Sequence, residues 1–300
     1  MIHDDFWILS GRWETPVDRI DARRIHAKLG WSQSYPTEEN PLGLSPLPLD
    51  QMQIDGRPKV LFYGDSYVGG HSRPENYLPN FLNDRLPESD VCHLGVGGYG
   101  TGQSLLMYEE TSQLCERPLV IMSAMVYDLD RSTLYVRSYQ KPRLKVTEGG
   151  DLETTNLPIE LDPERFFREA ELSFQSYALR ALQHWCMPLE DPHFQEKLKL
   201  NREILRAVKA RAEAEESELL YVLFHPIQEL IETDYRSTFF LESLAELGIE
   251  VFDTREPLEA YLTETGTDAS ELYVTGHHND LGNEVIGAAL LEELRSRGFR

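Results

Sequence analysis

The first stretch that could do chemistry is a serine directly after an apolar run. Residues 59–63 (KVLFY) lead straight into Gly64, Asp65 and Ser66. Backbone N–H groups are unpaired where a chain leaves a sheet for a loop or helix, and they can stabilise an oxyanion. Ser66 is therefore a candidate nucleophile. The triplet alone equally allows a simpler role, in which Asp65 or Ser66 only caps the following turn.

The second stretch is rich in glycine. Residues 93–106 (HLGVGGYGTGQSLL) carry five glycines between positions 95 and 102. Such density lets the backbone approach a ligand closely and frees an N–H to point at it. No acidic residue follows at the spacing that would bind a ribose, which argues against a dinucleotide site. A glycine turn of purely steric origin remains the alternative.

The third stretch is a histidine pair before the last predicted helix. Residues 275–287 (TGHHNDLGNEVIG) place His277 and His278 at a loop–helix junction. A histidine there can reach back to Ser66 and act as its general base. Together with Asp280 the pair could also suggest a metal site. Adjacent side chains diverge, however, and no fourth ligand is marked by spacing, so we predict no metal.

Short apolar runs alternate with amphipathic stretches from residue 59 onward, and the runs are continuous, as in strands covered on both faces. This alternation predicts an α/β fold, a three-layer α/β/α sandwich around a mostly parallel five-stranded sheet. The expected strands are 59–63, 90–96, 118–126, 218–224 and 249–253, and the expected helices are 75–86, 102–115, 163–186, 192–214, 234–247 and 283–297. Sites form beyond the carboxyl ends of such strands. That edge should hold Ser66, Gly98, Asp128, His225 and Asp253.

Two segments lie outside this alternation. Residues 1–57 are rich in proline and charge, and we expect them to pack on the domain as a lead-in without forming core elements. Residues 58–300 then form a single domain. Its insertion, about 129–160, contains a predicted hairpin turning at 148–151. The insertion follows the third strand, so it could be a lid over the site or a surface ornament.

Composition and charge limit the classes of partner that the protein can bind. The 300 residues carry a formal charge of −22, which opposes binding to nucleic acid or to an anionic membrane. Three scattered cysteines do not form a disulfide framework. No signal peptide and no apolar run of membrane-spanning length is visible. We therefore expect a cytoplasmic protein without a membrane span, and the oligomeric state is left open.

The three stretches, in this order, resemble the SGNH (GDSL-type) hydrolases, a family of esterases, lipases and acetyl-transferring enzymes. GDSYVGG resembles the first block, HLGVGGYGTGQSLL the second, VIMSAMVYDLDRS falls at the third, and GHHNDLGNEVIGAAL resembles the last. The resemblance spans about residues 59–130 and 218–295. It implies a flavodoxin-like sheet, Ser66 as nucleophile and His277 as base. It also implies that the Ser66 and Gly98 N–H groups form the oxyanion hole, with no cofactor.

The chain departs from the family pattern at three places. Tyr127 stands where the family has an oxyanion-hole Asn, and a tyrosine hydroxyl would have to assist from a shifted position. The Asp that orients the catalytic His is replaced by Thr275, or by Val274 in the Asp-x-x-His register. His93 replaces the usual Asn of the second block.

A carboxylate elsewhere could take over the orienting role. The candidates are Asp128, Asp253, Asp268 and Asp280, and the residues that could support the site more generally are Asp65, Asp128 and Thr275. We accordingly expect a serine esterase that cleaves a short-chain acyl ester, such as a carbohydrate O-acetyl group. The alternatives are an O-acetyltransferase and a catalytically weak or silent binding domain of the same fold.

Overall fold

The centre of the molecule is a five-stranded parallel sheet. The computed structural model describes residues 4–13, 21–38, 40–44, 56–172 and 193–300. The strands lie in the order β4-β3-β5-β8-β9, and every neighbouring pair is parallel. Their bounds are β3 Lys59–Gly64, β4 Asp90–Gly95, β5 Leu119–Met125, β8 Glu218–Phe224 and β9 Glu250–Asp253. All five predicted strands are thereby confirmed within one or two residues.

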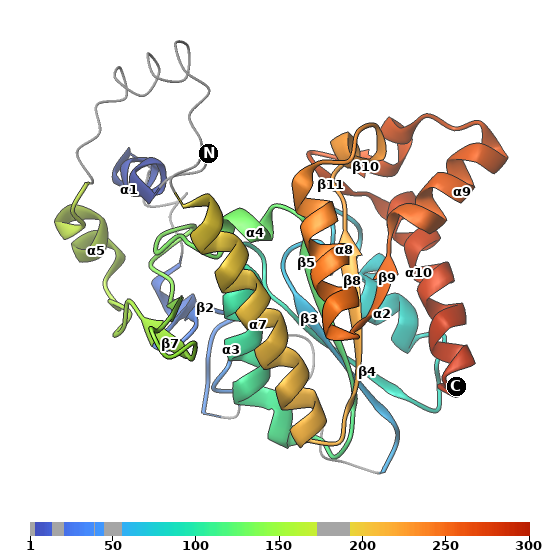
Figure 1. Ribbon diagram of the computed structural model, residues 1–300, viewed down its shortest axis with the longest axis horizontal. Coiled ribbons are helices and arrows are strands. Elements are labelled where there is room, and N and C mark those ends of the chain that lie inside the picture. Colours follow the sequence, from blue (N-terminus) through green and yellow to red (C-terminus); the bar gives the residue numbers. More distant parts are fainter. Residues whose placement is uncertain (1–3, 14–20, 39, 45–55, 173–192) are drawn as a thin grey trace.

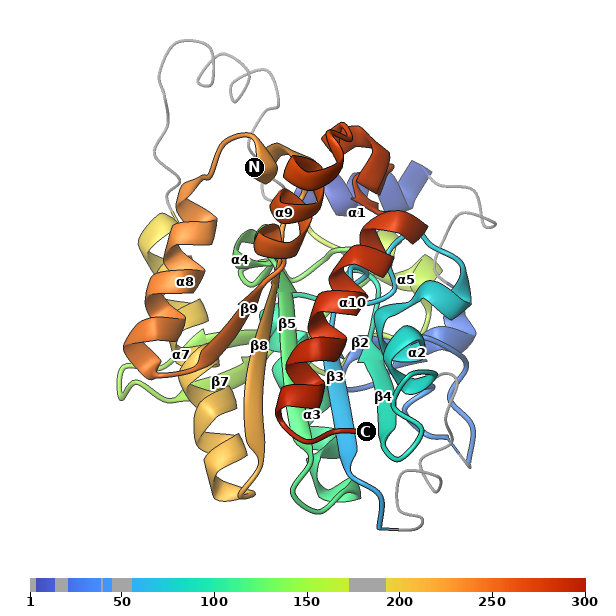
Figure 2. The same ribbon diagram turned by 90° about the vertical axis from the view of Figure 1, so that its right-hand side faces the viewer.

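Helices cover both faces of this sheet, which confirms the three-layer prediction. In Figures 1 and 2, α2 and α10 pack together on one side, and α3 and α7 pack together on the other. Every residue of β3 and β5 is buried, as continuous apolar strands between two helical layers should be. The helix bounds are α2 Leu78–Asn83, α3 Thr101–Thr111, α4 Asp128–Arg131, α7 Phe194–Ala214, α8 Tyr235–Leu247, α9 Arg255–Thr265 and α10 Asp280–Ser296.

Two helix predictions need correction, and one helix was missed. The helix expected at 75–86 is divided, because Tyr77 is extended between a 3-10 turn at Pro74–Asn76 and α2. The helix expected at 163–186 ends as α5, Pro163–Glu169, and residues 173–186 lie outside the described part. Arg12 donates to the carbonyls of Phe167 and Ala170 at that end. Helix α9 was not predicted.

The lead-in and the insertion add small elements beside the sheet. The lead-in contains α1 Asp4–Trp13, a 3-10 turn at Ala22–Arg24 and the strand pair β1 Ile25–His26 and β2 Gly30–Trp31. Contrary to our expectation it contributes to the core, since Ile8, Leu29 and Trp31 are buried in it. The insertion forms the predicted hairpin, β6 Arg143–Val146 and β7 Leu152–Thr155, and it packs against α3 and α7.

The strand order places a crevice at the carboxyl edge. Strand β4 lies on one side of β3 and β5 on the other, so the connections leaving β3 and β4 diverge to opposite faces. Ligands of such sheets bind at that reversal point. A further short hairpin, β10 Tyr273–Val274 with β11 His277–His278, precedes α10. The serine block follows β3, the glycine turn follows β4, and the histidine pair forms β11.

Candidate active site

Ser66 lies in the loop that leaves β3. At Gly64, the last residue of β3, an added Cβ would lie 2.0 Å from Ser123 Oγ, so only glycine lets the strand pass β5 this closely. Asp65 is buried, and its Oδ1 accepts the N–H of Tyr67 at 2.8 Å. The turn is thus capped by Asp65, while the Ser66 side chain remains free for chemistry.

A tight hairpin carries His277 to this serine. The two residues that connect β10 and β11, Thr275 and Gly276, both have positive φ (47° and 84°), as a type I′ turn requires. The hairpin places His277 Nε2 at 2.8 Å from Ser66 Oγ, across 211 positions of sequence. This is the distance at which an imidazole can take the proton of an attacking hydroxyl.

Two aromatic rings hold the His277 imidazole. His71 stacks on it, with centroids 4.2 Å apart and planes 13° apart, and Tyr67 lies at 4.9 Å on a tilted plane. His71 Nδ1 in turn hydrogen-bonds the Thr275 hydroxyl. Burial, and secondly the neighbouring His71 ring, lower the pKa of His277 below its ordinary value of 6.5. The ring is therefore neutral, and able to accept a proton, at neutral pH.

No carboxylate orients this imidazole. In the described part of the chain, the buried Nδ1 of His277 has no side-chain hydrogen-bond partner. The Thr275 backbone interacts with the ring and partly offsets the lowering of the His277 pKa. The four carboxylates that could have compensated are engaged elsewhere: Asp128 with Arg131, Asp253 with His225 and Arg255, Asp268 with Ser270, and Asp280 with Arg73. The structure thus shows a Ser–His pair without a carboxylate as the third member of a triad. Ring packing and the Thr275 backbone hold the imidazole.

Backbone donors lie beside the serine. Among the described residues, no backbone or side-chain acceptor takes the N–H of Ser66 or of Gly98. Gly98 has a φ of +83°, which a residue with a side chain rarely adopts. A Cβ on Gly97 would lie 3.8 Å from Ser66 Cβ, so the glycine turn runs against the serine. Two free N–H groups at this place can serve as an oxyanion hole.

Trp31 of the lead-in fixes the peptide between these two glycines. Its indole N–H donates to the Gly97 carbonyl at 2.9 Å, and its own carbonyl accepts the Tyr99 hydroxyl at 2.6 Å. The carbonyl of Gly97 and the N–H of Gly98 belong to one planar trans peptide and point in opposite directions. By holding the carbonyl, Trp31 sets the direction of the Gly98 N–H.

The strand order, β4-β3-β5-β8-β9, is that of a flavodoxin-like three-layer fold. The fold that the resemblance to SGNH-type hydrolases implies is thereby confirmed.

Comparison with known proteins gives only remote likenesses. No family model and no curated protein matches the sequence. The fold is similar to a lipase/acylhydrolase from Enterococcus faecalis (14% identity, TM-score 0.46, covering 80% of this chain and 96% of that one). It is also similar to LAE5, from the metagenome of Lake Arreo (14%, 0.48, 80% and 96%), and to a mutant of Axe2, an acetylxylan esterase from Geobacillus stearothermophilus (18%, 0.46, 80% and 95%).

Tyr127 lies apart from Ser66 and Gly98. Its ring lies beneath the Arg236 guanidinium, 4.9 Å from ring centroid to Cζ, on the side of α8. An oxyanion contact from its hydroxyl therefore stays a prediction without a geometric basis.

A buried charge network links the loops that follow β3 and β5. Arg131 Nη1 lies 2.9 Å from Asp65 Oδ2 and 2.6 Å from Asp128 Oδ1, and all three side chains are buried. Burial and the nearby Asp65 raise the pKa of Asp128. Because Asp65 follows β3 and Asp128 follows β5, the network ties two active-site loops together. Both carboxylates therefore hold these two loops in place through Arg131.

The second histidine of the pair faces another environment. His278 is fully buried, and its Nε2 lies 3.2 Å from the Tyr273 hydroxyl. Burial lowers the pKa of His278 to about 3, so it is neutral. No group of three or more His, Cys, Asp or Glu within the described residues is arranged to hold a metal ion. Nor does any described helix have the length and apolarity to cross a membrane.

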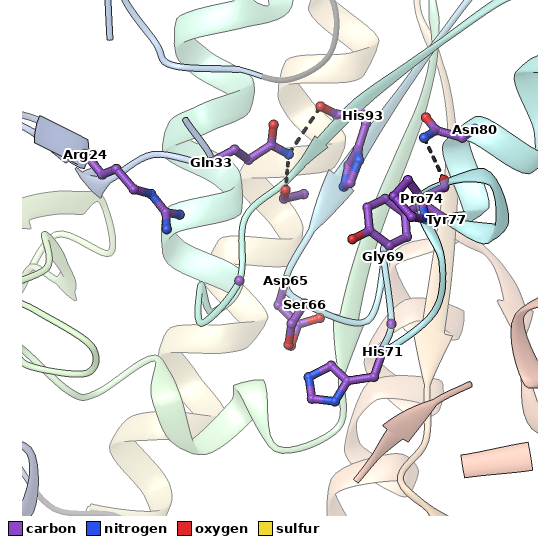
Figure 3. Close-up of a pocket in the computed structure, with 13 residues that line it drawn as sticks. Arg24, Gln33, Asp65, Ser66, Gly69, His71, Pro74, Tyr77, Asn80 and His93 are labelled. Atoms are coloured by element: carbon purple, nitrogen blue, oxygen red, sulfur yellow. Dashed lines mark hydrogen bonds between the residues drawn. The ribbon is translucent and has the colours of Figure 1, made fainter. Parts of the chain in front are cut away.

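A pocket of about 520 Å³ opens in front of Ser66 (Figure 3). Its lining combines glycine turns with polar side chains from the lead-in, the loop after β3 and the strand β4. The lining residues are Arg24, Gln33, Asp65, Ser66, Gly69, Gly70, His71, Pro74, Tyr77, Asn80, His93, Gly95 and Gly97. None of them belongs to the insertion at 129–160. The described lead-in, rather than the hairpin, forms the far wall of the pocket.

Sequence reasoning missed these side chains of the site: Arg24, Trp31, Gln33, His71, Tyr77 and Asn80. The first three come from a lead-in without a motif. Gln33 donates to the Gly95 carbonyl, which attaches the lead-in to β4 (Figure 3). His71 lies five residues after Ser66, and its nearness was the one available signal.

Proposed function

We propose that the protein is a serine esterase that cleaves a short-chain acyl ester with a Ser66–His277 dyad. The single observation that carries this proposal is the 2.8 Å contact between Ser66 Oγ and His277 Nε2 beside two unengaged backbone N–H groups. A serine that served only as a turn cap would require neither a neutral buried histidine nor free donors at its side.

The reaction proceeds in two halves. Ser66 Oγ attacks the acyl carbonyl carbon while His277 Nε2 takes its proton, and the Ser66 and Gly98 N–H groups stabilise the oxyanion. When the tetrahedral intermediate collapses, the carbon–oxygen bond to the alcohol breaks and His277 protonates the leaving oxygen. Water then attacks the acyl-enzyme, again giving its proton to His277, and Ser66 is released. If a sugar hydroxyl replaces water, the same steps make an O-acetyltransferase.

The character of the pocket favours a hydroxyl-rich alcohol. Gln33, Tyr77 and Asn80 line it with hydrogen-bonding groups, and His93 adds a ring whose pKa burial lowers to about 4. Such polar groups suit a carbohydrate better than a long acyl chain, because unpaired polar groups against apolar surface cost free energy. We therefore propose a carbohydrate ester, with an acetyl group as the acyl part.

Hydrolysis of 4-nitrophenyl acetate tests this function. We expect turnover by the wild-type protein, no turnover above buffer by Ser66→Ala, and a loss of at least about 10³-fold in His277→Ala. Thermal melting would show that both variants are folded. Wild-type turnover that survives in Ser66→Ala would refute the proposal.

The lack of an orienting carboxylate at His277, among the described residues, favours a second candidate, a silent binding domain of the same fold. Neutralising the orienting Asp of a well-studied triad lowers turnover about 10⁴-fold, so a pair without it is a weak catalyst at best. A folded protein that does not hydrolyse acetylated oligosaccharides, yet binds them in calorimetry, would establish this alternative.

A further inference from the structure

Arg24 brings a positive charge into the pocket of a strongly acidic protein. We propose that it binds an anionic group, a carboxylate or a phosphate, on the alcohol portion of the ester. The proposal rests on the esterase function above and specifies its substrate class. Figure 3 shows the Arg24 side chain extending from the lead-in toward the space in front of Ser66.

The hydrogen bonds of Arg24 position its guanidinium. Nε and Nη2 donate to the Ser32 carbonyl at 3.0 and 2.7 Å, which uses one edge of the planar group. Among the described residues, Nη1 has no acceptor, and no carboxylate forms an ion pair with Arg24. A guanidinium held along one edge is already oriented, so it loses little freedom when it binds an anion.

No other lining charge competes for this role. Asp65 is the one carboxylate among the described lining residues, and it is buried against Arg131. His93 is neutral at physiological pH, because burial lowers its pKa to about 4. Arg24 is thus a cation without a partner in a chain of net charge −22. An acidic surface would repel an anionic substrate unless such a charge received it.

The size of the pocket assigns the anion to the alcohol side. An acetyl group has only three heavy atoms and reacts at Ser66, so most of the 520 Å³ must receive the rest of the ester. An acidic sugar or a sugar phosphate fits this description. A charge-assisted hydrogen bond to the anion should change affinity about 10- to 100-fold.

Two aryl acetates of nearly equal shape test the proposal. The substrate 4-acetoxybenzoate is anionic, whereas 4-acetoxybenzamide is neutral, and the 3-substituted isomers vary the reach. We expect the wild-type protein to favour the acid about tenfold or more in kcat/KM, mainly through KM. Arg24→Gln should abolish the preference, and Arg24→Lys should retain part of it. An equal kcat/KM for acid and amide in the wild-type protein would overturn the proposal.

The neighbouring arginine is the matched control. Arg23 is exposed, pairs with Asp21 and does not line the pocket, so Arg23→Gln makes the same charge change outside the site. Its acid preference should equal that of the wild-type protein. If Arg23→Gln reduced the preference for the acid as much as Arg24→Gln does, the preference would come from the electrostatic field of the whole protein. That result would also overturn the proposal.

Binding separates this proposal from the esterase function. Calorimetry with Ser66→Ala measures 4-hydroxybenzoate against 4-hydroxybenzamide without any catalysis, and 4-hydroxyphenyl phosphate tests the phosphate form. Tighter binding of either anion, lost in Ser66→Ala/Arg24→Gln, would support the anion site even if the protein hydrolyses nothing. Equal binding of both anions and the amide would refute it even if esterase activity is found.

Discussion

His71 lies face to face with His277, with ring centroids 4.2 Å apart. The stacked ring buries the proposed base and disfavours a positive charge on it, and both effects lower the pKa of His277. Among the described residues, no carboxylate takes the position that it has in a triad. Packing against His71 and Tyr67, together with the Thr275 backbone, therefore orients the base here.

The first prediction concerns the pH profile. The base acts when neutral, and its lowered pKa keeps it neutral to a lower pH than a free histidine. Activity should therefore be full at neutral pH and fall as the pH drops through a midpoint below 6.5. In His71→Ala both causes of the lowering weaken, so the midpoint of kcat/KM should move to higher pH. A midpoint that stays in place, or moves down, would contradict this account.

The second prediction concerns the indole of Trp31. Trp31→Phe keeps an aromatic ring but removes the N–H that holds the Gly97 carbonyl. The Gly98 N–H then loses its fixed direction, and kcat should fall about tenfold with little change in KM. The loss should be smaller than the 10² to 10³ reported for removing an oxyanion donor outright.

Tyr99→Phe is the control for that experiment. It also removes a hydrogen bond between the lead-in and the glycine turn. In that bond the Tyr99 hydroxyl donates to the Trp31 carbonyl, and the Gly97–Gly98 peptide is not involved. Melting temperatures should fall comparably in the two variants, while kcat falls only in Trp31→Phe. Equal losses of kcat would show that the lead-in matters merely for stability.

The third prediction restores the missing carboxylate. Val274 lies opposite His277 across the β10–β11 hairpin, and side chains of such pairs share one face. Val274→Asp should place a carboxylate near Nδ1 and raise kcat at least about tenfold, against an upper bound of about 10⁴. Val274→Asn, of equal size and without charge, should gain much less. A folded Val274→Asp with unchanged kcat would argue against orientation as the limiting factor.

The fourth prediction concerns backbone strain at the same hairpin. Thr275 is β-branched and has a φ of +47°, a conformation that asparagine adopts far more readily. Thr275→Asn should stabilise the fold by about 1 kcal/mol, or about 2 °C in melting temperature. The threonine hydroxyl also hydrogen-bonds His71. The rate at which a fluorophosphonate labels Ser66 should therefore change together with stability. A lower melting temperature would contradict the strain argument.

The sheet could be predicted because its strands are continuous apolar runs buried on both faces. From their order along the chain, parallel topology brought Ser66, Gly98 and the histidine block to one edge. Helix α9 escaped prediction because it buries Leu258 alone and so lacks a clear apolar stripe. The part that the lead-in takes in the core and the pocket could not be predicted, because β2 and the 3-10 turn are too short to form a periodic pattern.

The finer parts of the site depend on contacts between distant segments. Trp31 meets Gly97 across 66 positions, and His71 meets Thr275 across 204. No spacing in the sequence marks such pairs, because each depends on a single side chain that hydrogen-bonds a group far away along the chain. The sequence could show that Thr275 and Val274 carry no charge. It could not show that stacked rings would hold the histidine instead.

Labelling with a fluorophosphonate probe, read by intact mass, is the most direct test of whether Ser66 is the nucleophile. We expect a single adduct on the wild-type protein, located at Ser66 by peptide mapping. We expect no adduct on Ser66→Ala, and labelling slowed at least about 10²-fold in His277→Ala. A folded wild-type protein that remains unlabelled, or that is labelled equally in Ser66→Ala, would contradict the assignment of Ser66 as the nucleophile.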